Sequence, residues 1–575
     1  MVLCVAGARL WLIFHYGSDQ PFHDQWTAEG FYRNWFDGNL EWRIFFYPHG
    51  EHRPALTRLL AMAEFWLNGQ WDARVQMVVN LGIYLLAVGT LVEFARRHLP
   101  PRASLVVAGI AVLLFAQPAN YENALWGFQS QFYFLLLLGT WHVLGSTRDR
   151  LDSRWLLAQC AGLLGLFSMA AGVMSASAVW ILAAFDLIRG KNRRRAMVTL
   201  IVNTALIAIA WLSFPASPVA HEARVQSVPQ FLAAFAYLLA WPLPFWWGAV
   251  LIVPWCWMVV QRQEDRGARG IVALGLWCGL MIAAFAFGRG SSPGRIAVRY
   301  QDVLTIGLFV NATAMVWLWS NAREQRRIWA ATGVLWMTVL GAGCWRANRP
   351  AELGRVLGEW RDYFVRQQAV IREFLVTDDE EVLSKDPLVR SFLPQFELAR
   401  DLLRDPSMRA RLSPSLVPAL RLERDAERSA GFEAAPSENV FAPTANASSE
   451  QWYVSVPLER TGMRVLRFSV KGEGARNEGL WLERSDGSRL EPLGAPVSAP
   501  RWKTLNVMPG DGDVRVVANA RAGSSFAFTA PIEVGTLSWL VPKLLSSWLG
   551  VLVAGMACLM LAGISTWLAQ RQRND

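Results

Sequence analysis

Acidic, histidine and aromatic residues are concentrated in one polar stretch near the N-terminus. It contains Phe22-His23-Asp24-Gln25-Trp26 and, further on, Tyr47-Pro48-His49-Gly50-Glu51-His52-Arg53-Pro54. A carboxylate such as that of Asp24 can act as a general base, taking the proton of a hydroxyl group as it attacks an activated carbon. Asp24 could equally cap a helix or pair with Arg53.

The other polar residues of this stretch are candidates for binding a substrate. His49 and His52 are three residues apart, a spacing that can place two imidazoles on one metal ion, although ordinary hydrogen bonding is the simpler alternative. Arg53 precedes a predicted helix that begins at Pro54, where the positive helix end favours a phosphate; a pair with Glu51 or Asp24 is the alternative. The predicted substrate contacts here are His23, Trp26, His49, Glu51 and His52.

A second polar segment lies further along the chain, between two apolar runs. It contains Glu122 and Asn123, and Gln129 lies at the start of the next run. Polar groups at such positions must face the protein interior or a wet cavity. They could bind sugar hydroxyls, or they could tie neighbouring helices together, and both alternatives stay open.

A third segment gathers arginines. Arg289, Arg295 and Arg299 lie within a short glycine-rich stretch, with Tyr300 directly after the last of them. Guanidinium groups suit the oxygens of a phosphate or pyrophosphate. We therefore predict a phosphate site here, with anchoring to lipid head groups as the alternative.

The elements that position these side chains are apolar. Of 575 residues, 53% are hydrophobic, and runs of roughly 18 or more apolar residues recur, each long enough to cross the hydrocarbon of a membrane. The net charge is +10, but the basic residues lie in short segments between apolar runs, which is typical of cytoplasmic loops and excludes nucleic-acid binding. The six cysteines show no CxxC spacing, which argues against a disulfide framework or a cysteine metal site.

About twelve membrane-spanning helices are predicted. If the basic segments are cytoplasmic, both termini are cytoplasmic and the polar loops 17–75, 118–127 and 289–302 lie outside. The apolar segment 229–243 is expected to lie at the interface or to re-enter, because a full crossing would turn 262–269 outwards. The helices are expected near 2–16, 76–95, 103–118, 128–146, 154–171, 174–189, 197–214, 244–261, 271–288, 303–320, 327–345 and 538–568.

The predicted fold is an α-helical polytopic membrane protein with a C-terminal extracytoplasmic β-sandwich domain. Residues 1–346 form the transmembrane domain, and 347–435 show helical periodicity. Residues 436–535 contain short strand-like runs separated by Asp-Gly turns, and 536–575 form the last membrane helix and a cytoplasmic tail. The first helix is short, so the natural start is expected upstream of Met1.

This pattern resembles the GT-C superfamily of membrane glycosyltransferases. Those enzymes use polyprenyl- or dolichyl-phosphate sugars and place an acidic residue in the first extracytoplasmic loop, where Asp24 is the matching residue. The loop from Arg289 to Tyr300 looks like the basic Arg-Tyr loop by which some bacterial members hold the donor phosphate. Glu51-His52-Arg53 looks like a stretch found in uncharacterised bacterial members. The resemblance covers roughly residues 1–346.

The resemblance implies sugar transfer with inversion from a polyprenyl-phosphate donor to a glycan, lipid or protein acceptor. Asp24 would deprotonate the acceptor, and Arg295 or Arg299 would stabilise the departing phosphate. Asp24 has no acidic neighbour, unlike the paired acids of several GT-C families, so no cofactor is expected and a divalent metal is not supported.

Other classes are a glycan polymerase, a lipid or glycan transporter (a flippase), and a non-catalytic scaffold. A transporter would place ionisable residues near helix centres, and the sequence shows few. The excess of arginine over lysine favours a bacterial inner membrane.

Overall fold

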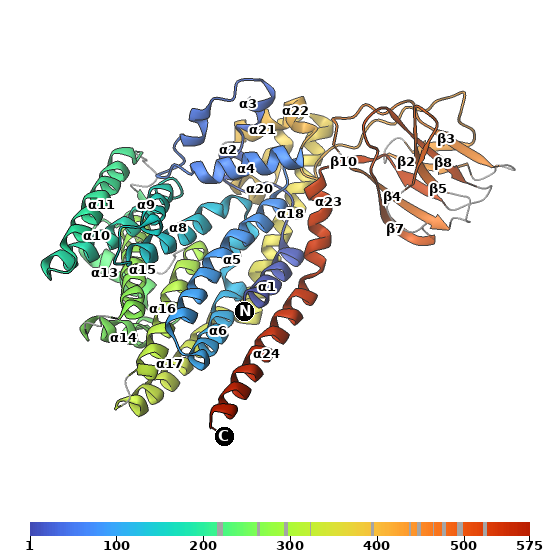
Figure 1. Ribbon diagram of the computed structural model, residues 1–575. Coiled ribbons are helices and arrows are strands. Elements are labelled where there is room, and N and C mark those ends of the chain that lie inside the picture. Colours follow the sequence, from blue (N-terminus) through green and yellow to red (C-terminus); the bar gives the residue numbers. More distant parts are fainter. Residues whose placement is uncertain are drawn as a thin grey trace.

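The computed structural model describes residues 1–215, 222–261, 265–291, 297–321, 324–392, 396–435, 439–444, 450–463, 465–473, 479–491, 498–520 and 526–574. Helices form most of the described chain, and the named strands lie between Phe432 and Val534 (Figure 1). A mostly helical protein with a β-rich region near its C-terminus agrees with the prediction.

The apolar part of the chain is a bundle of helices. Aspartate side chains fix several of its helix starts; Asp72, for example, accepts a hydrogen bond of 2.8 Å from the backbone N–H of Arg74. The helices are α1 (Val2–Tyr16), α5 (Ala73–His98), α6 (Pro101–Phe115), α7 (Tyr121–Leu125), α8 (Ser130–Ser146), α9 (Ser153–Gly165), α10 (Val173–Ile188), α11 (Arg193–Ser213), α13 (Val228–Ala240), α14 (Phe245–Val260), α15 (Arg266–Arg289), α16 (Gln301–Asn321) and α17 (Arg326–Ala347).

Fewer helices than predicted are long enough to cross a membrane. In the described residues, seven helices pass on length and apolarity, and an eighth is added if α6 and the segment Pro118–Leu125, bent by 50°, form one span. Helices α1, α8, α9 and α14 form where predicted but contain 15, 17, 13 and 16 residues. Helix α8 is shorter than predicted because a 3₁₀ turn (Gly127–Gln129) takes up the start of the run 128–146, whereas α14 continues through Pro254. The segment 229–243 forms α13, whose 13 residues are fewer than the roughly 20 of a full crossing.

The first polar stretch folds over one end of this bundle (Figure 1). It contains α2 (Gln25–Ala28), α3 (Tyr32–Phe36), a 3₁₀ turn (Trp42–Phe46) and α4 (Ala55–Asn68). Helix α4 begins directly after Pro54, as predicted, and ends at Gly69, whose φ of 71° suits a glycine.

The segment after α17 packs against the first polar stretch. It forms α18 (Pro350–Thr377), α19 (Glu380–Lys385), α20 (Pro387–Phe392), α21 (Phe396–Arg404) and α22 (Pro406–Arg409). Trp26, Tyr32 and Phe65 share one hydrophobic cluster with Ile371 and Phe374 of α18. Residues more than 300 positions apart in sequence thereby form one layer at this end of the protein.

The β-rich region contains two antiparallel sheets. One has the order β1-β2-β9-β4-β10, with β7 paired to β4, and the other has the order β3-β8-β5-β6. Side chains from both sheets, including Phe468 and Val516, join one hydrophobic cluster. The strands are β1 (Phe432–Ala435), β2 (Val440–Pro443), β3 (Gln451–Val454), β4 (Val465–Glu473), β5 (Gly479–Arg484), β6 (Arg489–Leu490), β7 (Ser498–Val507), β8 (Val514–Ala520), β9 (Ala527–Thr529) and β10 (Ile532–Val534).

The C-terminal segment returns to the bundle. The predicted helix 538–568 is divided into α23 (Thr536–Ser546) and α24 (Trp548–Asn574), and α24 runs beside α1 (Figure 1). The two helices approach closely because glycines face the contact. A Cβ added to Gly555 would lie 2.5 Å from the backbone nitrogen of Cys4, and one added to Gly7 would lie 2.6 Å from Leu552.

Candidate active site

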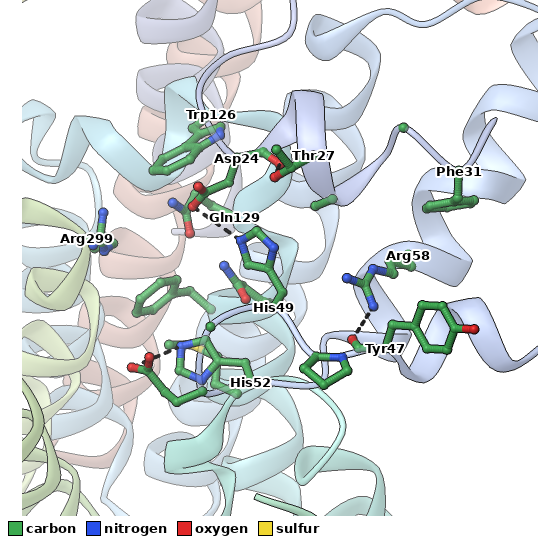
Figure 2. Close-up of a pocket in the computed structure, with 18 of the residues that line it drawn as sticks. Asp24, Thr27, Phe31, Tyr47, His49, His52, Arg58, Trp126, Gln129 and Arg299 are labelled. Atoms are coloured by element: carbon green, nitrogen blue, oxygen red, sulfur yellow. Dashed lines mark hydrogen bonds and ion pairs between the residues drawn. The ribbon is translucent and has the colours of Figure 1, made fainter. Parts of the chain in front are cut away.

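A polar cavity of about 790 Å³ opens beneath the first polar stretch (Figure 2). Its walls come from α2, from the segment Tyr47–His52, from the 3₁₀ turn before α8, and from the end of α15 and the segment that leads into α16. The predicted site residues that line it are Asp24, His49, Glu51, His52, Gln129, Arg289, Arg299 and Tyr300. The structure therefore brings together residues from all three polar segments.

Asp24 precedes α2 and carries an imidazole on each carboxylate oxygen. His23 Nδ1 lies 2.7 Å from Oδ1, and His49 Nε2 lies 3.5 Å from Oδ2. Burial by itself would raise the pKa of Asp24, but the hydrogen bonds and charges of these two histidines outweigh it and hold the pKa well below its ordinary value. His23 adopts a φ of 47°, an uncommon conformation for a non-glycine residue. Asp24 is thus an ionised carboxylate in a fixed orientation.

His49 and His52 are joined by a tight turn. Each donates its backbone N–H to the other's carbonyl oxygen, at 2.8 and 3.0 Å, and Gly50 between them has a φ of 56°. The turn directs His49 towards Asp24 (Figure 2), whereas Nδ1 of His52 accepts a hydrogen bond of 3.1 Å from the backbone N–H of Ala170. Burial lowers the pKa of His52 to about 4. His52 is therefore neutral at physiological pH.

Two arginines from the third polar segment reach the cavity, each beside a carboxylate. Arg289 forms an ion pair with Glu51. Arg299 donates to Oε1 of Glu122 at 2.9 Å, and its backbone N–H donates to the same carboxylate. Tyr300 is 5% exposed. These pairs hold the guanidinium groups at the cavity wall, and a guanidinium has five N–H donors in all, so each keeps donors for a further anion beyond those used in its pair.

Arg58 also lines the cavity, and our sequence reasoning missed it. It lies on α4, is 6% exposed, and donates to the backbone carbonyls of Ile44 and Tyr47. Burial lowers its pKa to about 10, so it remains charged at neutral pH. Arg58 is the one arginine in the apolar run Ala55–Leu67, and this isolated charge could have marked it as a candidate site residue.

Two predicted site residues, Arg53 and Trp26, lie away from the cavity, and a third falls outside the described residues. Arg53 does not line the cavity; its guanidinium donates to the carbonyl oxygens of Ser213 and Phe46, both at 2.8 Å. Trp26 is fully buried in the cluster with Trp71, because α2 turns it away from the face that carries Asp24. Arg295 lies outside the described residues.

The second polar segment combines two kinds of role. Gln129 is 1% exposed, lines the cavity, and its Oε1 has no hydrogen-bond partner among the described residues. Asn123 is also buried, but it donates to the carbonyl of Arg299 at 2.7 Å and to Asp302 at 2.8 Å. Glu122 pairs with Arg299. Asn123 therefore ties helices together, whereas Gln129 lines the cavity with an amide oxygen that no described residue satisfies.

A buried ion pair joins α1 to α16 and contacts residues of the second polar segment. Arg9 in the middle of α1 lies 3.5 Å from Asp302 in the first turn of α16, and both side chains are at most 2% exposed. Arg9 also donates to the carbonyls of Phe115 and Asn120 at 3.1 and 3.0 Å. The expectation of few ionisable residues within the helices overlooked this pair, which links α1 to the segment that carries Arg299.

A second cavity of about 500 Å³ adjoins the first and is almost entirely apolar. Glu51, His52, Met169, Arg289 and Tyr300 line both cavities. The rest of the second lining includes apolar residues of α10, α13 and α15, among them Val173, Met174, Phe231, Leu280 and Phe285. Polar and apolar compartments thus meet at Arg289.

A metal centre is not evident in the described part of the chain. No group of three or more histidine, cysteine, aspartate or glutamate side chains with suitable geometry occurs there. Asp24, His23 and His49 lie together, but there each imidazole contacts the carboxylate.

No protein-family model matches the chain, and no curated protein matches it. Among solved structures, it is similar to the crystal structure of the Archaeoglobus fulgidus oligosaccharyltransferase complex with zinc and sulfate, at 13% identity and a TM-score of 0.39. The match covers 60% of this chain and 53% of the archaeal protein, so it spans about half the length of that enzyme.

Proposed function

We propose that this protein is a membrane glycosyltransferase that moves a sugar from a polyprenyl-phosphate-linked donor to a glycan, lipid or protein acceptor of the cell envelope, with inversion at the anomeric carbon. The observation that carries the proposal is the junction of the two cavities. An apolar compartment suits a prenyl chain, and a polar compartment with a carboxylate and guanidinium groups suits a sugar and its phosphate. Arg289 lies where the two meet.

The proposed reaction assigns one role to each wall of the polar cavity. Asp24 takes the proton of the acceptor hydroxyl, whose oxygen bonds to the anomeric carbon while the bond from that carbon to the phosphate oxygen breaks. Arg289 and Arg299 stabilise the departing phosphate, where negative charge develops. A carboxylate of low pKa suffices if the proton moves late, because the hydroxyl becomes more acidic as its oxygen bonds to carbon.

The location is also part of the proposal. The distribution of basic residues supports an extracytoplasmic site on a bacterial inner membrane, with both termini in the cytoplasm. We propose that the short helices α1, α8, α9 and α14 complete about twelve crossings, since a bilayer can thin around a short helix. The two sheets around one cluster support the sandwich interpretation of the β-rich region.

Donor binding and consumption test the function. The full chain in nanodiscs is incubated with polyprenyl-phosphate sugars and an acceptor panel, and mass spectrometry follows the release of free polyprenyl phosphate. We expect release by the wild type and donor affinity about tenfold weaker in Arg289→Gln. Arg43→Gln is the matched control, because Arg43 is exposed and does not line either cavity. Equal donor affinity in all three proteins, or the absence of donor binding, would contradict the proposal.

A further inference from the structure

Asp24 also borders a third cavity, which we call the α18 cavity. Its volume is about 560 Å³, and it shares Asp24, Trp126 and Arg299 with the polar cavity. Its remaining walls come from Phe22 and His23, from α7, from α18, including Trp360 and Tyr363, and from Leu388 of α20. One carboxylate therefore faces two compartments, and the roles proposed so far use only one of them.

Aromatic rings form one wall of the α18 cavity. Phe22 lies at the centre of this wall, with ring centroids 4.7 Å from Trp360, 5.2 Å from Trp126 and 5.2 Å from Tyr363. The indole Nε1 of Trp360 is buried and has no hydrogen-bond partner among the described residues. A rigid aromatic wall with an unsatisfied N–H donor suits a ligand that has apolar C–H faces and hydroxyl oxygens, which is the chemistry of a sugar.

The charges of the α18 cavity favour hydrogen-bond donors over anions. Its lining contains four carboxylates, those of Asp24, Glu122, Glu359 and Asp362. These carboxylates outnumber the two arginines of the lining, Arg299 and Arg366, and Arg366 also pairs with Asp386, outside the lining, at 3.6 Å. Carboxylates accept hydrogen bonds from hydroxyl or ammonium groups and repel a uronic acid or a phosphate.

We propose that the α18 cavity is the acceptor subsite, and that it takes a neutral or amine-bearing saccharide unit with a hydroxyl group placed at Asp24. The donor sugar then reaches Asp24 through the polar cavity, and the acceptor reaches it through the α18 cavity. This inference rests on the proposed glycosyl transfer, since Asp24 is its shared base. The segment from α18 onwards thereby becomes part of the substrate-binding surface.

Saturation-transfer NMR on the full chain in nanodiscs tests the subsite with three probes: methyl β-D-glucopyranoside, D-glucosamine and D-glucuronate. The first two should bind the wild type, and glucuronate should bind at least tenfold more weakly. Trp360→Leu should weaken saccharide binding about tenfold. Trp345→Leu is the matched control, because Trp345 lies on the preceding helix, is 67% exposed and does not line the cavity.

A second variant guards against a folding defect in Trp360→Leu. Asp362 is exposed, so Asp362→Asn should fold normally and should reduce the preference for D-glucosamine over the neutral glycoside. Native mass spectrometry of the same samples measures binding of a polyprenyl-phosphate sugar, which both variants should retain. If the wild type does not bind the polyprenyl-phosphate sugar, the proposed function is contradicted, whether or not the three saccharides bind. Failure of all three saccharides to bind, equal binding of glucuronate, or binding that neither variant alters would overturn the subsite.

Discussion

Replacing Asp302 with asparagine tests whether the buried ion pair holds the active site in place. The substitution removes the negative charge beside Arg9 while keeping the shape of the side chain. Arg9 is 1% exposed, so its guanidinium would remain in the protein interior without a counter-charge. Asp302 also accepts the hydrogen bond from Asn123, which in turn holds the carbonyl of Arg299.

The expected loss follows from the contacts that remain. Removing one partner of a buried ion pair costs about 3–5 kcal/mol. Arg9 would retain its bonds to the carbonyls of Phe115 and Asn120 and to the hydroxyl of Tyr84, so we expect the lower end, about 3 kcal/mol. The double variant Arg9→Met/Asp302→Asn should recover most of this loss, because it removes the buried charge itself.

The assay is an unfolding titration with SDS in mixed micelles, followed by tryptophan fluorescence. Glu93→Gln is the control, because Glu93 pairs with Arg96 and Arg97 at 2.6 and 2.7 Å but on an exposed surface, where the loss should stay below about 1 kcal/mol. Asp302→Asn should also lower the rate of glycosyl transfer, since Arg299 loses a support. A loss of stability no larger than that of Glu93→Gln, or additive effects in the double variant, would refute the reasoning.

Three further predictions concern pH, helix packing and metals. Burial raises the pKa of Glu29 from 4.5 to about 7, so the folded state binds this proton more tightly than the unfolded state does. The free energy of unfolding should therefore fall by up to about 3 kcal/mol as pH rises from 4.5 to above 7. Unfolding titrations of Glu29→Gln at pH 5 and pH 8 should lack this part of the pH dependence, and an unchanged dependence would contradict the prediction. Gly555→Val should destabilise the protein by about 1–3 kcal/mol, because the added side chain clashes with Cys4. Gly563→Val is the control, because no atom lies within 4 Å of its new Cβ. Equal unfolding midpoints for the two variants would contradict the close packing of α1 against α24. Donor consumption should survive EDTA, because guanidinium groups are proposed to stabilise the phosphate; a loss that Mg²⁺ or Mn²⁺ restores would show a metal requirement.

Local features of the fold were predictable from sequence because they depend on neighbouring residues. Pro54 marked the start of α4, and alternating runs marked five of the strands, β3, β4, β5, β7 and β8. In the described residues, seven or eight helices are long enough to span, and one reason is that the first residues of an apolar run can form a turn, as Phe128 and Gln129 do in the run 128–146.

Which of the predicted site residues share the cavity could be foreseen only in part. Asp24, placed directly after the first helix, lines the cavity, whereas Trp26 does not, because residues two apart on a helix face different sides. Thr27 and Ala28, three and four positions after Asp24, line the cavity instead. The Arg9–Asp302 pair joins residues 293 positions apart, and the sequence contains no local feature that links them.

The central claim is that Asp24 is the base of a glycosyl transfer. The most direct measurement compares donor affinity and single-turnover transfer in the wild type, Asp24→Asn and Asp37→Asn, where Asp37 belongs to the same polar stretch but does not line the cavity. We predict that Asp24→Asn binds the polyprenyl-phosphate sugar as the wild type does but transfers it at least 10²-fold more slowly, with Asp37→Asn unchanged. Transfer by Asp24→Asn at the wild-type rate would contradict the account.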